Sequence, residues 1–227
     1  MNISPKIWKI HSKSTNFLLT CILMKKLGLR EILTLFLKRI FSFDHYYVMQ
    51  RSLSLPIDIQ RLRLQVDLQK VNDDEMCQVI EKIDHLDTDS KRELISRILF
   101  YRNGIKHCYI AKTKDDEIIY LQWLIYPTEN DIIKKFYKGV FNPLKDNQVL
   151  IENVFTFPKF RGQGLIVHIT AKLLEIARDD GYKGAIMYIR KDRIESLSQN
   201  MMLGFKITSL LREYKIFGIT KRHPIQI

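Results

Sequence analysis

The sequence predicts an α/β (α+β) fold in which helices flank one central sheet, preceded by an N-terminal helical extension. Three observations predict it. Polar and apolar residues alternate over residues 61–68, two helical stretches follow, and a glycine-rich turn near residue 162 joins a strand to a helix. With 227 residues, 46% of them apolar, the chain is long enough to bury a substantial core.

The first 58 residues are predicted to form a basic extension, separate from a main domain at residues 59–227. Residues 1–60 carry nine lysines and arginines against three acids, a net charge of +6 out of the total of +12. Apolar side chains recur every three or four positions between residues 17 and 41, which predicts an amphipathic helix bent at Gly28. The apolar run at residues 16–24 is shorter than the ~20 residues that a membrane span requires.

Three partners are open for this extension. A basic amphipathic helix in residues 1–45 could make peripheral contact with an anionic membrane, pack on the main domain, or form a homodimer. Nucleic acid is disfavoured, because the basic residues are interleaved with long aliphatic ones rather than with stacking aromatics. The three cysteines lie far apart without metal-ligand spacing, so we expect no metal and a cytoplasmic location, with possible peripheral attachment at the inner membrane face.

The first half of the main domain reads as a strand, two helices and a hairpin. Helices are predicted at residues 73–86 and 90–102, and Ser90 and Glu93 have the spacing of a capping box. Strand-like runs joined by a turn-prone segment predict a β-hairpin within residues 106–126.

The second half begins with residues 128–147, which contain one short amphipathic piece and look like an insertion over the sheet. A loop of this length is either a lid that contacts substrate or a surface elaboration. The elements predicted after it are a strand at 149–157, a helix at 164–179, a strand at 185–190, a helix at 193–203 and one or two strands within 205–217.

The residues between the first of these strands and its helix suit an anion. Gly162 and Gly164 let the backbone turn tightly, so that successive N–H groups and the unpaired donors of a helix start can surround a phosphate. Arg161 adds a positive charge beside them.

Two common phosphate-binding loops do not fit this stretch. A Walker loop requires Lys and Ser or Thr after its last glycine, where Leu165 and Ile166 stand. A dinucleotide fingerprint requires a third glycine at Val167, and an acid after the next strand, where Arg190 stands.

The stretch instead resembles the signature of the GNAT superfamily of N-acetyltransferases. That signature is Arg or Gln, two residues, Gly, one residue, and Gly or Ala, and Arg161, Gly164 and Ile166 occupy its positions, the last as a departure. A second motif of the family, Asn-x-x-Ser or Ala followed by Gly-Phe, matches at Ser196 and at residues 204–205, with Arg193 in place of Asn.

The resemblance covers residues 60–217 and implies a mostly antiparallel sheet with one splayed parallel strand pair, 149–157 and 185–190. The splay would hold acetyl-CoA or another acyl-CoA, with the pantetheine along the first strand and the pyrophosphate on the glycine loop. The cofactor-binding residues implied are Val154, Phe155, Thr156, Arg161, Gly162, Gln163, Gly164, Leu165, Ile166 and Ser196.

Three residues are predicted to be catalytic. Glu152 lies in an otherwise apolar strand, and alternation places it on the face of Val154 and Thr156, so we expect it to accept the proton of an attacking amine. Family members often protonate the leaving thiolate with a tyrosine, and Asn200 stands at that position, where it can only hydrogen-bond the sulfur. Tyr214 is a candidate substitute, as is Tyr188.

The function these features imply is transfer of an acyl group from CoA to a primary amine of a small or of a lipid- or sugar-linked acceptor. The alternative is a catalytically degenerate module with this fold that binds CoA, a membrane or a protein partner.

Overall fold

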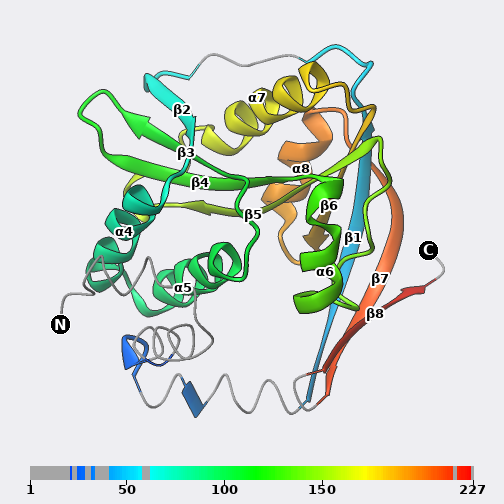
Figure 1. Cartoon of the computed structure of the whole chain (residues 1–227), viewed down its shortest axis with the longest axis horizontal. Helices are drawn as coiled ribbons and strands as arrows, with labels where there is room; N and C mark the ends of the chain where they lie inside the picture. The colour runs from blue at the N-terminus through cyan, green and yellow to red at the C-terminus, as the bar shows by residue number, and fades with distance from the viewer. Residues whose placement is uncertain are drawn as a thin grey trace.

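The computed structural model describes residues 21, 25–28, 32, 33, 41–57, 62–216 and 219–225. One sheet runs through this part of the chain, in the order β2-β3-β4-β5-β6-β1-β7-β8 (Figure 1). The strands are β1 (Phe41–Ser52), β2 (Val66–Lys70), β3 (Cys108–Thr113), β4 (Ile118–Ile125), β5 (Gln148–Thr156), β6 (Gly184–Arg190), β7 (Lys206–Ile216) and β8 (Ile219–Ile225).

Among the described strands, β5 and β6 form the one parallel pair. Their pairing covers only Gln148 with Gly184, Val149 with Ala185 and Leu150 with Ile186. Beyond Leu150 the two strands separate, although β5 continues to Thr156 and β6 to Arg190. The predicted mostly antiparallel sheet with a splayed parallel pair is therefore confirmed.

The position of β1 corrects the predicted domain boundary. Residues 41–52 were assigned to the extension that ends at residue 58, but β1 pairs with β6 on one side and with β7 on the other. Both edges of β1 are hydrogen-bonded, and Met49 in its middle is fully buried. The main domain thus includes β1, while the helix predicted for residues 17–41 falls mostly outside the described residues.

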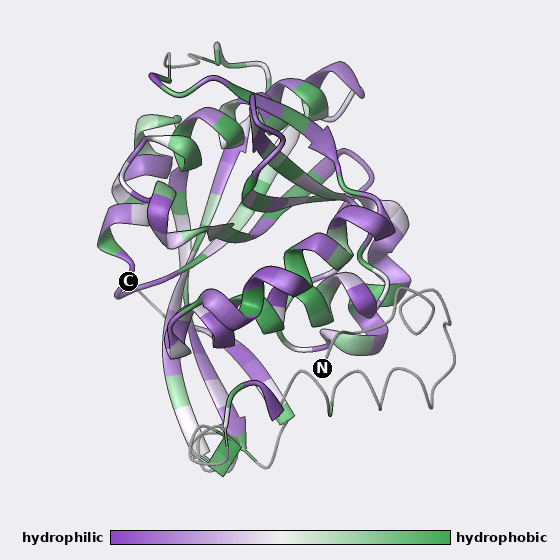
Figure 2. Ribbon diagram, turned by 90° about the vertical axis from the view of Figure 1, so that its left-hand side faces the viewer, coloured by the Kyte–Doolittle hydropathy of each residue, from purple (hydrophilic) through white to green (hydrophobic). Residues whose placement is uncertain are grey.

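Helices cover both faces of the sheet. The helices α4 (Asp73–Glu81) and α5 (Thr88–Arg102) lie on one face, and α7 (Leu165–Asp179) and α8 (Ile194–Met202) lie on the other (Figure 1). In Figure 2 the helical ribbons alternate between hydrophobic and hydrophilic colours, as expected of helices with one buried and one exposed face.

Several local boundaries differ from the prediction. The strand predicted at residues 61–68 is β2 at Val66–Lys70, and a 3-10 turn, η1 (Lys82–His85), follows α4. The N-cap of α5 is Asp87, whose side chain accepts from the Ser90 N–H, so Ser90 does not cap this helix. The spacing of Ser90 and Glu93 therefore does not mark a capping box in this helix.

The segment 128–147, predicted to be an insertion, packs on the sheet at Phe141, whose ring centre is 5.4 Å from that of Tyr188 on β6. It begins within η2 (Pro127–Glu129) and includes α6 (Asn130–Phe136), and the residues after α6 contact β8. The Arg222 N–H donates to the Gly139 carbonyl at 2.9 Å. Gly139 has a φ of +82°, and a Cβ there would stand 2.5 Å from the Thr220 carbonyl oxygen, so glycine is required at this contact.

No helix in the described ranges has the length and apolar character needed to cross a lipid bilayer.

The placement of β1 inside the sheet predicts where truncation of its side chains is costly. Met49→Ala should lower the free energy of unfolding by about 2–5 kcal/mol, because a cavity forms between packed strands. Phe43→Ala on the same strand, where the side chain is 60% exposed, should change it by less than about 1 kcal/mol. Chemical denaturation measures both, and equal effects would contradict the buried position of β1.

Candidate active site

The candidate active site lies at an irregularity in the strand β5. Leu121 and Trp123 of β4 face Phe155 and Glu152 of β5, so β5 holds one residue more than its partner between these pairs. The extra residue is accommodated at Asn153, whose φ of +57° is left-handed, a conformation that asparagine adopts more readily than most residues. A β-bulge at this point bends β5 away from its regular course.

The bulge overturns the predicted orientation of Glu152. Regular alternation would place Glu152 on the face of Val154 and Thr156, but the extra residue reverses the phase. Because cross-strand partners point to the same side, Glu152 instead shares a face with Phe155.

The carboxylate of Glu152 lies where the parallel strands part. The Tyr188 N–H on β6 donates to Oε1 at 3.0 Å, and the Asn153 N–H donates to Oε2 at 3.2 Å. Burial raises the pKa of Glu152, while the charge of Arg222, these N–H donors and Arg97 oppose the rise. The carboxylate of Glu152 thus connects β5 to β6 where the two strands begin to separate. Its raised pKa makes it a stronger base than an ordinary glutamate.

The glycine loop leads from β5 into α7 as predicted. Gly162 and Gly164 have φ of +75° and +76°, and Gly164 is the N-cap of α7. It provides no side-chain cap, and the first turn of α7 contains no acid, whereas the first turn of α4 contains three. The N-terminal N–H groups and dipole of α7 therefore suit an anionic ligand.

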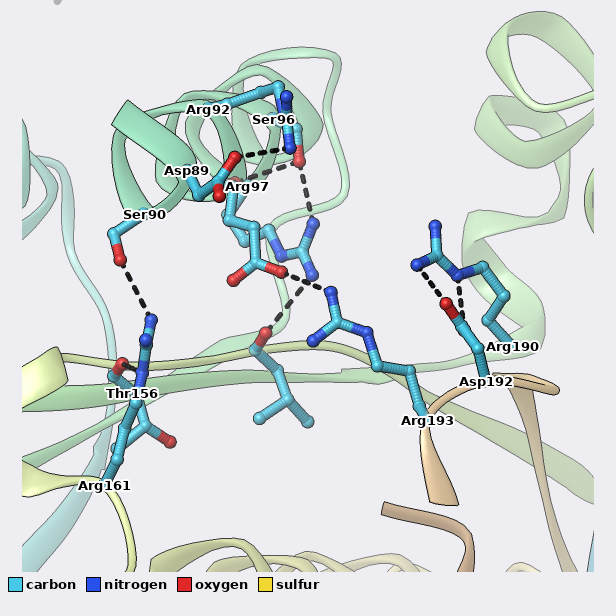
Figure 3. Close-up of polar contacts among 12 residues, drawn as sticks. Asp89, Ser90, Arg92, Ser96, Arg97, Thr156, Arg161, Arg190, Asp192 and Arg193 are labelled. Atoms are coloured by element: carbon cyan, nitrogen blue, oxygen red, sulfur yellow. Dashed lines mark hydrogen bonds and ion pairs between the residues drawn. The ribbon is translucent and has the colours of Figure 1, made fainter. Parts of the chain in front are cut away.

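Arg161 bridges the end of β5 and the helix α5 (Figure 3). Its Nη2 donates to Ser90 Oγ on α5 at 3.0 Å, and its Nε donates to the Thr156 carbonyl at 3.2 Å. The bond to Ser90 links the glycine loop to α5.

A polar stripe on α5 faces the splay, and sequence reasoning missed its role. Ser90, Glu93 and Arg97 lie three and four positions apart, so they share one helical face. Glu93 Oε1 accepts from Arg193 Nη2 at 2.9 Å, and Arg97 Nη2 donates to the Val154 carbonyl at 3.3 Å (Figure 3). The spacing that suggested a capping box is the signal that could have revealed this stripe.

The other predicted cofactor residues divide between cleft and core. Phe155 and Leu165 are buried in the hydrophobic core, and Ile166 packs against that core, partly buried. Gln163 is exposed on the loop, and the Ser196 carbonyl accepts from Asn200. The departure from a small residue at Ile166 is thus accommodated by packing.

The other two predicted catalytic residues lie on α8 and β7. Asn200 is buried, and its Nδ2 donates to Ser196 O of its own helix at 2.8 Å. Tyr214 lies on β7, two strands beyond β6, which is on the order of 10 Å away at ~4.8 Å per strand. The sequence gives no sign that β1 separates β6 from β7.

A cluster of aromatic rings lies beside Glu152, around a cation supplied by β8. The Arg222 guanidinium carbon stands 3.8 Å from the ring centre of Tyr46, 5.2 Å from that of Tyr188 and 5.6 Å from that of Phe141. Its Nε donates to Glu213 Oε2 at 2.7 Å, and both side chains are buried. Burial and the charge of Glu213 raise the pKa of Tyr46 to about 12. These groups come from β1, β6, β7, β8 and the 128–147 segment.

No cluster of three or more His, Cys, Asp or Glu side chains suited to a metal ion occurs within the part of the chain that the structure describes.

Solved structures match this architecture, whereas no protein-family model and no curated protein sequence matches the chain. A GCN5-related glucosamine N-acetyltransferase region of a fungal multi-domain GH3 beta-N-acetylglucosaminidase matches at 12% identity and a TM-score of 0.58, covering 81% of this chain and 22% of that one. A GCN5-related N-acetyltransferase from Sphaerobacter thermophilus matches at 12% and 0.51, covering 88% and 58%. A GNAT-family acetyltransferase from Colwellia psychrerythraea matches at 10% and 0.50, covering 82% and 57%.

The chain has the fold of the GNAT superfamily, as predicted. It spans less than three fifths of the length of each of these three solved chains, and at 10–12% identity the likeness is one of fold.

The electrostatics of the site can be tested directly. Replacing the buried pair together, as Glu213→Gln with Arg222→Met, removes a positive charge near Glu152 without leaving a carboxylate unpaired, so the pKa of Glu152 should rise further. Carbon-13 NMR titration of the Glu152 carboxyl measures this. Arg190→Met, which removes an arginine paired with Asp192, should leave that pKa within about half a unit.

Proposed function

We propose that this protein is an acyl-CoA-dependent N-acyltransferase that acts on a primary amine of a small or of a lipid- or sugar-linked acceptor. The observation that carries the proposal is the splay between β5 and β6, with an uncapped helix start at one end and a buried carboxylate at the other. The GNAT fold supports it, because the solved neighbours named as N-acetyltransferases share this arrangement of elements.

The thioester would enter the splay from the glycine loop. Its pyrophosphate suits the N–H groups at the start of α7 and the guanidinium of Arg161. A surface cavity of about 460 Å³ lies beside this loop, lined by Leu62, Leu64 and His168 among others, and provides room for the nucleotide part. The carbonyls of Val154 and Thr156 already accept from arginines, and each retains a second lone pair for a pantetheine amide.

The chemistry requires one proton acceptor. The acceptor amine attacks the thioester carbonyl carbon, a C–N bond forms, the C–S bond breaks, and the amine loses a proton. Glu152 takes that proton, directly or through one water, since burial has raised its pKa. The CoA thiolate leaves without an acid from the protein, because a thiol pKa of ~8.5 makes it a good leaving group.

A second candidate function is a CoA-binding module without catalysis. It is favoured by Asn200, which is turned toward its own helix, and by the distance of Tyr214 from the splay. Turnover separates the two candidates: a protein that binds acetyl-CoA but transfers nothing to a panel of amines, including amino sugars, would be this module.

Isothermal titration with acetyl-CoA tests the binding step. We expect a one-to-one complex, and Arg161→Ala should weaken it about tenfold or more, since a charge-assisted contact to phosphate is lost. Lys159→Ala, which removes an exposed cation two residues away, should change the affinity by less than about threefold. Failure of the wild-type protein to bind any acyl-CoA would rule out the proposal.

The role of Glu152 predicts a pH dependence. The base must be ionised, so kcat/KM should rise with pH through the pKa of Glu152, which lies above that of an ordinary glutamate. Glu152→Gln should lower kcat by about 10²- to 10⁴-fold and abolish this acidic limb. A variant that keeps the limb would show that another group accepts the proton.

A further inference from the structure

Arg97, on the polar stripe of α5, forms no ion pair with a carboxylate within the part of the chain that the structure describes. Among the described residues its guanidinium makes two contacts, from Nη1 to Ser96 Oγ at 2.8 Å and from Nη2 to the Val154 carbonyl at 3.3 Å. Its Nε is buried and donates to no acceptor. Glu93, one helical turn earlier, is paired with Arg193 instead.

The charges of Glu93 and Glu152 offset part of the charge of Arg97, but neither carboxylate is paired with it, so a ligand that completes its hydrogen bonds would be favourable. A buried guanidinium has lost its hydration, and a long bond to a neutral carbonyl replaces little of it. An arginine stays protonated at all ordinary pH values, so it cannot relieve the cost by losing its proton. Its planar set of N–H donors matches the two oxygens of a carboxylate, which would also satisfy Nε.

The position of Arg97 places such an anion at the reacting end of the cleft. Arg97 contacts the carbonyl of Val154, two residues beyond Glu152 along β5, and its charge acts on the Glu152 carboxyl. Arg161 is held at the far side of the splay, beside the glycine loop, by Ser90 and Thr156 (Figure 3). The two arginines therefore serve different parts of the cleft, and the pyrophosphate requires only the loop side.

We propose that Arg97 binds a carboxylate of the substrate, carried either by a short dicarboxylic acyl group on CoA or by an amino-acid-like acceptor. The proposal rests on the N-acyltransferase function and defines the class of its substrate. In either case the carboxylate lies within a few bonds of the carbonyl that the amine attacks.

The first arm of the test compares acyl donors that differ only in charge. Succinyl-CoA and butyryl-CoA have four-carbon acyl groups, and only the former carries a carboxylate. If the acyl group supplies the anion, wild-type protein should bind succinyl-CoA about 10- to 100-fold more tightly than butyryl-CoA in isothermal titration, and Arg97→Met should remove this preference.

The second arm compares acceptors. If the acceptor supplies the anion, wild-type protein should not distinguish the two thioesters, but it should acylate L-alanine with a kcat/KM about 10- to 100-fold above that for ethylamine, measured by release of the CoA thiol. Arg97→Met should again remove the preference, and Arg97→Lys should retain part of it because the charge remains.

Controls distinguish this role from a purely structural one. Circular dichroism shows whether each variant folds, and Arg190→Met, which removes an arginine paired with Asp192, should leave both preferences unchanged. Absence of a carboxylate preference in both arms, or equal losses for charged and neutral substrates in folded Arg97→Met, would overturn the proposal. Failure of the wild-type protein to bind CoA thioesters at all would instead overturn the proposed function.

Discussion

The bulge at Asn153 is the constraint on which the site depends. One extra residue in β5, in a left-handed conformation, turns the strand away from β6 after three paired residues. Beyond Leu150 the edge of β5 that faces β6 has no strand to pair with, and the carbonyls of Val154 and Thr156 accept from Arg97 and Arg161. Glu152, Arg97 and Arg161 all lie in this gap, and each reaches it from a different segment of the chain.

The charged side chains around this gap are stabilised by opposite charges, backbone N–H groups and aromatic rings. Glu152 is stabilised by two backbone N–H groups and by the nearby charges of Arg222 and Arg97. Arg222 is in turn held by Glu213 and by the aromatic rings of Tyr46, Tyr188 and Phe141. Strands β1 and β8 therefore contribute to the environment of a residue on β5.

The sequence predicted most of the second half of the fold, because its signals are local. The glycine loop, α7 and the strands on either side follow from turn residues and hydrophobic periodicity within short windows. The prediction for residues 41–52 was wrong. Their basic neighbours in the sequence placed them in the extension, whereas they form the central strand β1. Their partners are about 140 and 165 positions away, and pairing over such separations leaves no local pattern.

The features of the candidate site also divide into those that the sequence predicts and those that depend on the tertiary structure. By itself the sequence determined the glycine loop before α7 and singled out Glu152, since glycines before a helix and a lone acid in an apolar strand are recognisable in isolation. Only the tertiary structure decided the face of Glu152, the distance of Tyr214 from β6 and the position of Arg97, because a bulge, an inserted strand and a helix packed over the sheet are contacts between distant segments. A turn or a single charged residue is recognisable from its neighbours in the sequence, whereas the surroundings of Glu152 depend on how distant segments pack.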